Sequence, residues 1–183
     1  MRVKTTAFQE VLIVEPDAFP DKRGYFMEIY HQEKYEKLGI RRNFVQDNLS
    51  YSVKGTLRGL HYQYPHGQAK LVQAIRGEIF DVAVDIRLRS PNFGKWVSIV
   101  LSEENKRQFY VPEGFAHGFY VLSDGALVHY KCTDFYLPKN EGGVLWSDHH
   151  LQIDWPVRTP VISEKDNSYP LLDDVPKSRL PVC

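Results

Sequence analysis

Hydrophobic and polar residues alternate most regularly between Ile79 and Arg87. A period of two places four apolar side chains on one face of this segment: Phe80, Val82, Val84 and Ile86. The opposite face carries Asp81, Asp85 and Arg87. This pattern predicts a strand with its apolar face on a core, and we expect the charged face to lie on the outside, away from any functional site.

Weaker versions of the same pattern recur along the chain, and turn residues such as Ser90-Pro91-Asn92 and Asp124-Gly125 separate them. A loop is predicted from Asp17 to Gly24, and a short helix from Gln32 to Leu38 that ends at Gly39. The remaining predicted strands are Glu10–Glu15, Tyr25–Tyr30, Leu71–Ile75, Trp96–Leu101, Gln108–Val111, Phe119–Leu122 and Ala126–Thr133. Short strands at this spacing indicate an all-β fold, an antiparallel sandwich or barrel, with the residues after Tyr136 packed on it as an extended tail.

Length and composition are those of one globular domain spanning residues 1–183. Lys and Arg number 23, as do Asp and Glu, so no net charge draws the protein to nucleic acid or to a membrane surface. No apolar run is long enough for a membrane span, and no Gly-rich phosphate-binding motif is present. Two cysteines are too few for a disulfide framework, and we expect a reducing, cytoplasmic location.

Candidate chemistry concentrates in the stretch 55–77, GTLRGLHYQYPHGQAKLVQAIRG. His61 is the candidate acid–base group, and Arg58 and Lys70 are cations that could hold the charge it creates. A second stretch, PEGFAHGF, places His117 in a predicted Gly-rich turn. We expect the fold to bring both stretches to the mouth of one cavity.

The spacing Gly55-x5-His61, followed by Pro112-x-Gly114-x2-His117, is similar to the two-part motif of the cupin superfamily, whose His and Glu residues bind a metal. Gln63 stands where that motif has its second His, and Lys70 stands near the position of the Glu. An ammonium has no lone pair to donate and repels a divalent cation. The sequence therefore predicts a cupin-type β-sandwich with no metal.

A closer resemblance covers nearly the whole chain. The segments RGYFMEIY, FVQDN, LRGLHYQ, GEIFDVAVDIR, PEGFAHGF, YKCTDFY, VLW, IDWP and SEKD resemble the dTDP-4-dehydrorhamnose 3,5-epimerase family in order and spacing. The resemblance implies a jelly-roll cupin dimer that needs no cofactor. It implies inversion of C3 and C5 in a dTDP-linked 4-keto-6-deoxy sugar, which yields the keto precursor of L-rhamnose, a sugar of cell-surface polysaccharides.

This chemistry needs a base beside each carbon, a donor for the enolate oxygen and an acid on the opposite face. His61 suits the base, and Lys70 suits the oxyanion, with Arg58 or His117 as alternatives. Tyr130 is the candidate acid. The resemblance implies that Asp166 pairs with His61 and that Tyr136 stacks on thymine. It also implies nucleotide and sugar contacts at Arg23, Glu28, Gln46, Asp47, Asn48, Arg58, Lys70, His117, Glu141 and Lys165.

The sequence also predicts that copies of the chain associate with one another. The segments Glu10–Glu15 and Tyr25–Tyr30 are too apolar for the free edge of a barrel. The resemblance implies a homodimer in which the arm of residues 1–30 lies at the interface and carries Arg23 and Glu28 to the neighbouring site.

Three alternatives to a 3,5-epimerase remain open. A single-centre epimerase would share these motifs, and His61 and Tyr130 would not distinguish it. A metal-dependent cupin enzyme is disfavoured by Lys70 and Gln63. A binding or structural cupin would need neither a base nor an acid, so the combination of His61, Tyr130 and Asp166 argues against it.

Overall fold

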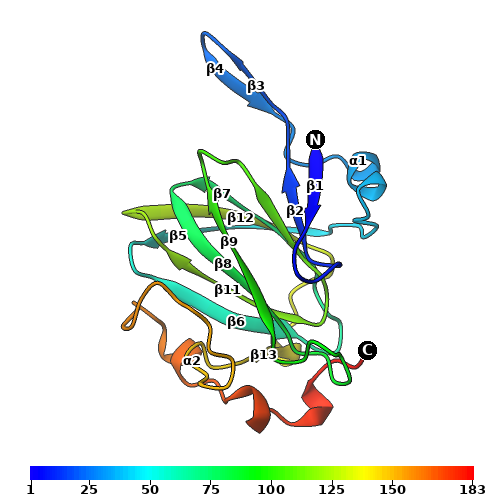
Figure 1. Ribbon diagram of the computed structural model, residues 1–183, viewed down its shortest axis with the longest axis vertical. Coiled ribbons are helices and arrows are strands. Elements are labelled where there is room, and N and C mark those ends of the chain that lie inside the picture. The colour runs from blue at the N-terminus through cyan, green and yellow to red at the C-terminus, as the bar shows by residue number, and fades with distance from the viewer.

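The computed structural model describes all residues, 1–183, and consists of two antiparallel sheets packed face to face (Figure 1). A six-stranded sheet has the order β1-β2-β10-β7-β12-β5, and a five-stranded sheet has the order β13-β6-β11-β8-β9. A separate hairpin, β3–β4, stands away from both sheets. Strands that neighbour one another in these sheets are mostly distant in sequence, as in a jelly roll of the cupin type. The predicted fold class is confirmed.

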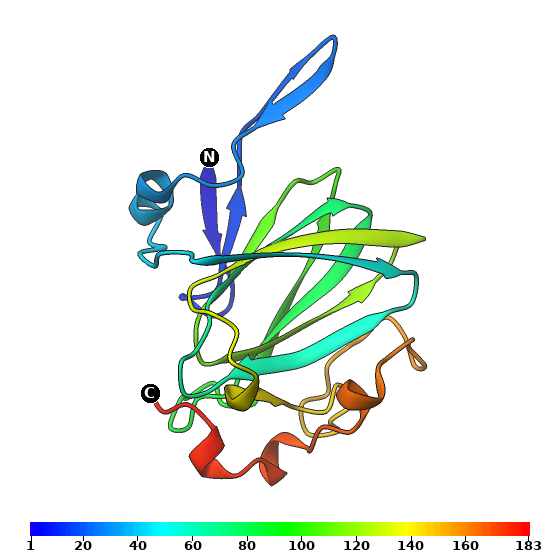
Figure 2. The same ribbon diagram turned by 180° about the vertical axis from the view of Figure 1, so that it is seen from behind.

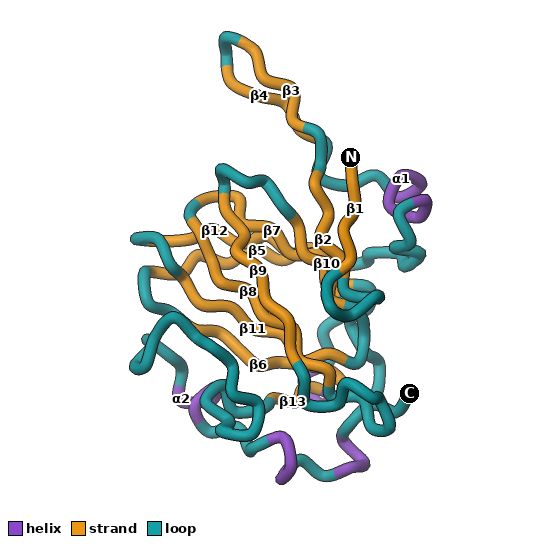
Figure 3. Tube along the Cα trace, viewed as in Figure 1, coloured by secondary structure: helices purple, strands orange, loops and turns teal.

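Strands account for most of the regular structure (Figure 3). The six-stranded sheet contains β1 (Arg2–Thr5), β2 (Leu12–Glu15), β5 (Gln46–Val53), β7 (Lys70–Arg76), β10 (Gln108–Val111) and β12 (Gly125–Cys132). The five-stranded sheet contains β6 (Leu57–Gln63), β8 (Glu78–Asp85), β9 (Trp96–Ser102), β11 (Phe115–Val121) and β13 (Glu141–Gly143). The hairpin is β3 (Ala18–Asp21) with β4 (Gly24–Met27). The helices are α1 (Gln32–Lys37) and α2 (Glu164–Asn167), with 3-10 turns at Pro138–Asn140, Leu172–Asp174 and Lys177–Arg179. Neither α1 nor α2 is long enough to cross a membrane.

The main core fills one end of the space between the two sheets. Val72, Phe109 and Val128 enter it from the six-stranded sheet, and Ile79 and Phe119 enter it from the five-stranded sheet. All five side chains are at most 5% exposed. Because the sheets diverge from this packed end, the other end can accommodate polar side chains between them.

Strand β8 contradicts the prediction that Asp81 and Asp85 lie on an outer face. Both side chains are fully buried, because the odd-numbered positions of β8 point between the sheets. The even-numbered positions are also covered, since the C-terminal segment packs over them (Figure 2). The side chains that cover this face include Leu151, Trp155, Leu172, Val175 and Leu180. The predicted packed tail is therefore confirmed, and it explains why β8 has two buried faces.

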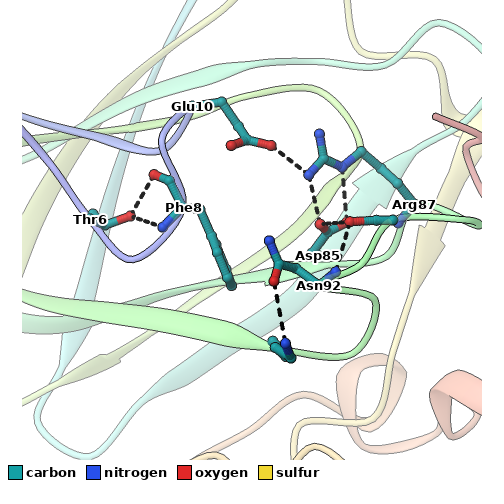
Figure 4. Close-up of polar contacts among 8 residues, drawn as sticks. Thr6, Phe8, Glu10, Asp85, Arg87 and Asn92 are labelled. Carbon is teal, nitrogen blue, oxygen red and sulfur yellow. Dashed lines mark hydrogen bonds and ion pairs between the residues drawn. The ribbon is translucent and has the colours of Figure 1, made fainter.

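Asp85 is compensated by Arg87 at the end of β8, as Figure 4 shows. Arg87 donates from Nε to Asp85 Oδ1 at 2.9 Å and from Nη2 to Asp85 Oδ2 at 2.6 Å. The same Nη2 lies 2.6 Å from Glu10 Oε1, in the loop before β2. Ser90 Oγ adds a further hydrogen bond to Asp85. This ion-pair network ties the N-terminal loop to the C-terminal end of β8.

The N-terminal region departs from the prediction in two places. The segment predicted as a loop, Asp17–Gly24, contains strand β3, which forms a hairpin with β4 that turns at Lys22-Arg23, and the strand predicted over Tyr25–Tyr30 is present as the shorter β4. The segment predicted as an apolar edge is not an edge, because β1 pairs with β2 on one side and β10 pairs with it on the other. Strand β1, whose side chains are exposed, was not predicted. The hairpin instead carries the exposed apolar side chains Phe19, Tyr25 and Phe26.

His117 lies in a strand and not in the turn that the glycines of PEGFAHGF suggested. Gly114, with a φ of +87°, makes the turn, and β11 begins at Phe115. Gly118 is needed for a different reason, because a Cβ there would lie 2.7 Å from the Arg58 carbonyl oxygen. Strands β6 and β11 therefore approach closely, and His117 lies directly opposite His61.

Candidate active site

A cavity of about 260 Å³ lies between the sheets at the end away from the main core. Its walls come from β5, β7 and β12 of the six-stranded sheet and from β6 and β13 of the five-stranded sheet. The residues that line it are Gln46, Asn48, His61, Tyr62, Gln63, Gln68, Lys70, Tyr130, Cys132, Tyr136 and Glu141. Seven of these were predicted site residues, so the fold brings together side chains spread over 96 positions of sequence.

His61 projects from β6, and its Nε2 lies 2.9 Å from Oδ1 of Asp166. The other carboxylate oxygen, Oδ2, accepts a hydrogen bond from the Gly59 amide at 3.1 Å. Burial raises the pKa of Asp166, but hydrogen bonds from His61, Gly59 and Ser163 outweigh burial and lower it overall. An ionised Asp166 keeps a proton on Nε2, so Nδ1 of His61 carries the free lone pair. The predicted pair of His61 and Asp166 is present in the structure.

Lys70 begins β7 and is half-buried in the cavity. Burial lowers its pKa, while the nearby carboxylates of Asp81 and Glu141 act in the opposite direction. Negative neighbours thus offset part of the cost of holding an ammonium away from water. Lys70 is the one cation among the residues that line the cavity.

Tyr130 enters from β12, on the same side of the strand as Val128 and Cys132. Burial raises the pKa of its phenol, and the neighbouring Cys132 adds to this. The phenol therefore keeps its proton at neutral pH. His61 and Tyr130 come from different sheets, so they face the cavity from opposing walls.

A polar cluster closes one side of the cavity. Glu141 Oε2 accepts a hydrogen bond from Tyr136 Oη at 2.8 Å and from Lys165 Nζ at 2.6 Å. Burial raises the pKa of Glu141, but the hydrogen bonds from Lys165 and Tyr136 lower it overall. Gln46 Oε1 accepts from the Tyr136 amide at 2.9 Å, which fixes the backbone beneath the half-exposed ring. Three of the predicted contacts, at 136, 141 and 165, thus form one cluster.

Four predicted contacts lie elsewhere in this chain. Arg23 and Glu28 are on or beside the projecting hairpin, bonded to Asp21 and Lys34 respectively. Asp47 points to the outer face of β5 and pairs with Lys131. Arg58 donates to Ser52 Oγ at 2.9 Å and faces a separate hollow that Asp166 also borders.

His117 is buried behind His61 and does not line the cavity. Its Nε2 lies 2.7 Å from Oδ1 of Asp81, whose other oxygen has no hydrogen-bond partner. Burial lowers the pKa of His117, and Asp81 opposes this shift. His117 on β11 and Asp81 on β8 therefore form a second His–Asp pair beside the first. The sequence analysis did not predict this pair, because it placed Asp81 on the outer face of its strand.

Sequence reasoning missed several residues at the site, namely Tyr62, Gln68, Cys132, Asp81 and Tyr169. Gln63 was noted only as a missing metal ligand, but it has a structural role. Its amide nitrogen donates to the carbonyl of Phe135 at 3.1 Å, and its oxygen accepts from the Leu137 amide at 2.8 Å. Gln63 thereby holds the loop that carries Tyr136. The feature of the sequence that could have indicated Tyr169 as a site residue is its position three residues after Asp166.

No group of three or more His, Cys, Asp or Glu side chains is arranged to hold a metal ion. The absence of a metal requirement stays a prediction.

Comparisons with known proteins agree with this geometry. A family model described as dTDP-4-dehydrorhamnose 3,5-epimerase matches residues 5–174. The dTDP-4-dehydrorhamnose 3,5-epimerase of Shigella flexneri is 56% identical over 168 residues, which cover 91% of this chain and 93% of the relative. The dTDP-4-dehydrorhamnose 3-epimerase of Streptomyces niveus is 40% identical over 174 residues, covering 94% of this chain and 84% of the relative.

Solved structures with a closely similar fold agree with these sequence comparisons. The crystal structure of dTDP-6-deoxy-D-glucose-3,5-epimerase RmlC from Legionella pneumophila Philadelphia 1 contains dTDP-4-keto-L-rhamnose. It has a TM-score of 0.97 and 51% identity to this chain, covering 100% of this chain and 98% of the other.

Proposed function

The chain belongs to the dTDP-4-dehydrorhamnose 3,5-epimerase family, and we propose how its residues carry out the reaction of that family. It is an isomerase of a dTDP-linked keto sugar that inverts C3 and C5 of dTDP-4-dehydro-6-deoxy-D-glucose and forms dTDP-4-dehydro-L-rhamnose. Each inversion removes a proton from a carbon next to the C4 ketone and returns one to the opposite face. The residues proposed for these steps are His61, Asp166, Lys70 and Tyr130.

In the first step, Nδ1 of His61 takes the proton, and the electron pair of the C–H bond moves onto the C4 oxygen to give an enolate. Asp166 stabilises the imidazolium through its hydrogen bond to Nε2. The Lys70 ammonium donates to the enolate oxygen, where a preorganised donor is most effective in a site that excludes water. No cofactor is needed in this scheme.

In the second step, Tyr130 donates its phenolic proton to the carbon from the other face, and the enolate collapses back to the ketone. The Tyr130 phenolate then takes a proton from solvent and His61 releases its proton, which restores both groups for the second inversion. The single observation that carries this scheme is that His61 and Tyr130 line one cavity from opposing sheets. A base and an acid on the same wall would return the proton to the face it left, and no inversion would result.

Nucleotide binding is assigned to the polar cluster at the cavity and to side chains near it. Tyr136 is half-exposed and fixed at its backbone, so its ring is available to stack on thymine. Gln46, Asn48, Glu141 and Lys165 supply polar contacts on the same side. Asp47, Arg58 and His117 are proposed to contact the substrate only with side-chain movement, since none lines the cavity.

The protein is further proposed to act as a homodimer. The outer face of the six-stranded sheet exposes Leu49, Tyr51 and Val53 on β5 and Ile75 on β7. The hairpin exposes three more aromatic rings. A second copy that covers this face would bury these side chains, and its hairpin would bring Arg23 and Glu28 to the neighbouring cavity. Both cysteines are free thiols, which supports the cytoplasm as the place of action.

The test is position-resolved deuterium uptake from D2O into dTDP-4-keto-6-deoxyglucose, followed by NMR after dialysis of the protein against a strong chelator. Uptake is expected at both C3 and C5. His61→Asn should fold normally and lower both exchange rates by about 10²–10⁴-fold, the usual contribution of a general base. His150→Asn, an exposed control, should not change them.

Near-normal exchange in folded His61→Asn would show that another group is the base. Uptake at C3 alone would place the chain with single-centre enzymes such as the Streptomyces niveus relative. Activity that is lost with the chelator and restored by Fe, Mn or Zn would overturn the metal-free scheme.

A further inference from the structure

Tyr169 touches the His61 imidazole from the C-terminal segment. The two ring centroids are 5.8 Å apart, and the ring planes are inclined at 72°, an edge-on arrangement. His61 is therefore held by two groups from the same short stretch of chain, with Asp166 at Nε2 and Tyr169 against the ring.

The space for the Tyr169 ring exists only because Gly143 has no side chain. Gly143 pairs directly with His61 across β13 and β6. A Cβ at Gly143 would lie 2.4 Å from Cε2 and Cζ of Tyr169, which no real contact allows. The ring is thus seated over the backbone of Gly143, beside His61.

The hydroxyl group of Tyr169 is less well accommodated than its ring. Its Oη is buried and makes no hydrogen bond of normal geometry, although Lys165 lies near enough to oppose the rise of its pKa. Burial and the charge of Glu141 raise the pKa of Tyr169 to about 12, so the phenol stays neutral near pH 7. A buried hydroxyl without a partner costs free energy, so any benefit of this side chain must come from the ring.

Hydrogen bonds fix the chain on both sides of Tyr169. Ser163 Oγ accepts from the Asp166 amide at 3.1 Å and caps α2. After Tyr169, the Pro170 carbonyl accepts from the Leu145 amide at 2.8 Å. The backbone that carries Tyr169 is therefore held on both sides of the residue.

We propose that Tyr169 is a positioning residue for His61. Its ring blocks rotation of the imidazole away from Asp166 and keeps water from the His61–Asp166 pair, so that the Nδ1 lone pair stays aimed into the cavity. This role rests on the proposed function of His61 as the base. Misplacing a reacting group by about 1 Å can cost on the order of 10²-fold in rate, which sets the scale of the effect.

The experiment compares Tyr169→Ala with Tyr169→Phe. Tyr169→Ala is expected to lower kcat by about 10- to 100-fold with KM nearly unchanged. Tyr169→Phe keeps the ring and should retain the kcat of the wild type. Leu172→Ala is the control, because Leu172 anchors the same segment in the core beneath it without touching His61; it should lower Tm and leave kcat unchanged.

A second readout needs no substrate. The ¹⁵N NMR shifts of the His61 imidazole report its tautomer, which should be Nε2–H in the wild type and in Tyr169→Phe. In Tyr169→Ala the signals should indicate a mixture of tautomers. Asp166→Asn provides the reference for an imidazole that has lost its partner.

Wild-type kcat and unchanged His61 signals in Tyr169→Ala would overturn the proposal. The proposal would also be overturned if Tyr169→Phe lowered kcat as much as Tyr169→Ala does, or if Leu172→Ala did so. A different result would separate the two proposals. If His61→Asn were active, His61 would not be the base; if the His61 signals still changed in Tyr169→Ala, Tyr169 would nevertheless be shown to hold the imidazole.

Discussion

Lys70 is the residue at which this chain differs most from metal-binding cupins, and its surroundings suit a charge that appears only during the reaction. Its ammonium lies in a half-buried position where burial lowers its pKa and nearby negative charges oppose this shift. Such a donor needs no reorganisation when the enolate forms, because it is already fixed at the cavity wall.

Lys70→Met should therefore lower kcat by about 10²–10³-fold, with a smaller effect on substrate affinity. Lys70→Glu should be worse, because it places a carboxylate beside the developing enolate. Steady-state kinetics with dTDP-4-keto-6-deoxyglucose measures both, and Lys177→Met, at an exposed position, is the control. A higher KM with kcat intact would make Lys70 a phosphate contact and leave the enolate to another donor.

Tyr130 and Tyr136 line the same cavity but should affect different kinetic constants. Tyr136→Ala removes a stacking surface, which contributes roughly 1–3 kcal/mol per base, so Kd for dTDP should rise while the chemical step is retained. Tyr130→Phe removes one hydroxyl and little surface, so binding should persist and inversion should fail. Isothermal titration with dTDP and single-turnover kinetics separate the two effects. If both variants changed only affinity, Tyr130 would not be the acid.

At the scale of an element, β8 carries two buried carboxylates, and each depends on a different partner. Burial raises the pKa of Asp85, but hydrogen bonds from Arg87 and Ser90 outweigh it, so the folded pKa lies below the unfolded value. A carboxylate with a depressed pKa stabilises the fold above its unfolded pKa of about 4 and loses this contribution as pH falls through its folded pKa.

Arg87→Met should destabilise the protein by about 3–5 kcal/mol at neutral pH, because it leaves the buried Asp85 uncompensated. The difference from the wild type should shrink below about pH 4, where Asp85 is protonated in the unfolded chain. Urea unfolding across a pH series measures this. Adding Asp85→Asn to the variant should restore part of the loss, and Arg76→Met, which is exposed, should have little effect. An equal loss at every pH would show that packing, not charge, makes Arg87 important.

At the scale of the whole molecule, the outer face of the six-stranded sheet is covered by α1 at one end and open at the other. Tyr35 and Ile40 pack on β2, β7 and β10, whereas the apolar outer side chains of β5 are exposed. Leu49 and Tyr51 are each 63% exposed on this open side. Together with the projecting hairpin, this face is the interface proposed for the dimer.

Leu49→Glu should therefore produce a monomer at micromolar concentration with little loss of fold, because the side chain is exposed within one chain. Sedimentation velocity measures the mass, and the monomer should be nearly inactive if each cavity needs the partner's hairpin. Val100→Glu, an exposed apolar position on the other sheet, is the matched control. If the wild-type protein were a fully active monomer, the proposal that two subunits share each site would be wrong.

Mixed dimers test the sharing directly. His61→Asn and Arg23→Ala should each be nearly inactive alone. If the hairpin crosses to the neighbour, mixing and refolding them in equal amounts should restore about one quarter of the wild-type sites, because each mixed dimer holds one site free of both changes. If the hairpin serves its own subunit, every site keeps one defect and no activity returns.

The sequence by itself determined the fold class and seven of the eleven residues that line the cavity. Alternation over Ile79–Arg87 and the regular turn residues specify an antiparallel β fold, because a period of two is a local property of a strand. The motif positions of His61, Lys70 and Tyr130 could be recognised because each lies in a short segment of distinctive residues, whereas Glu141 was implied only by the family resemblance.

Only the tertiary structure decided what each strand face meets. The polar face of β8 is buried because the sheets pack over it, so Asp81 pairs with His117 and Asp85 with Arg87. The contact of His61 with Asp166 joins residues 105 apart, and Tyr169 reaches His61 only where Gly143 leaves space. The β3–β4 hairpin, with Arg23 at its turn and Glu28 directly after it, stands away from both sheets (Figure 1), because a hairpin's direction depends on packing between elements.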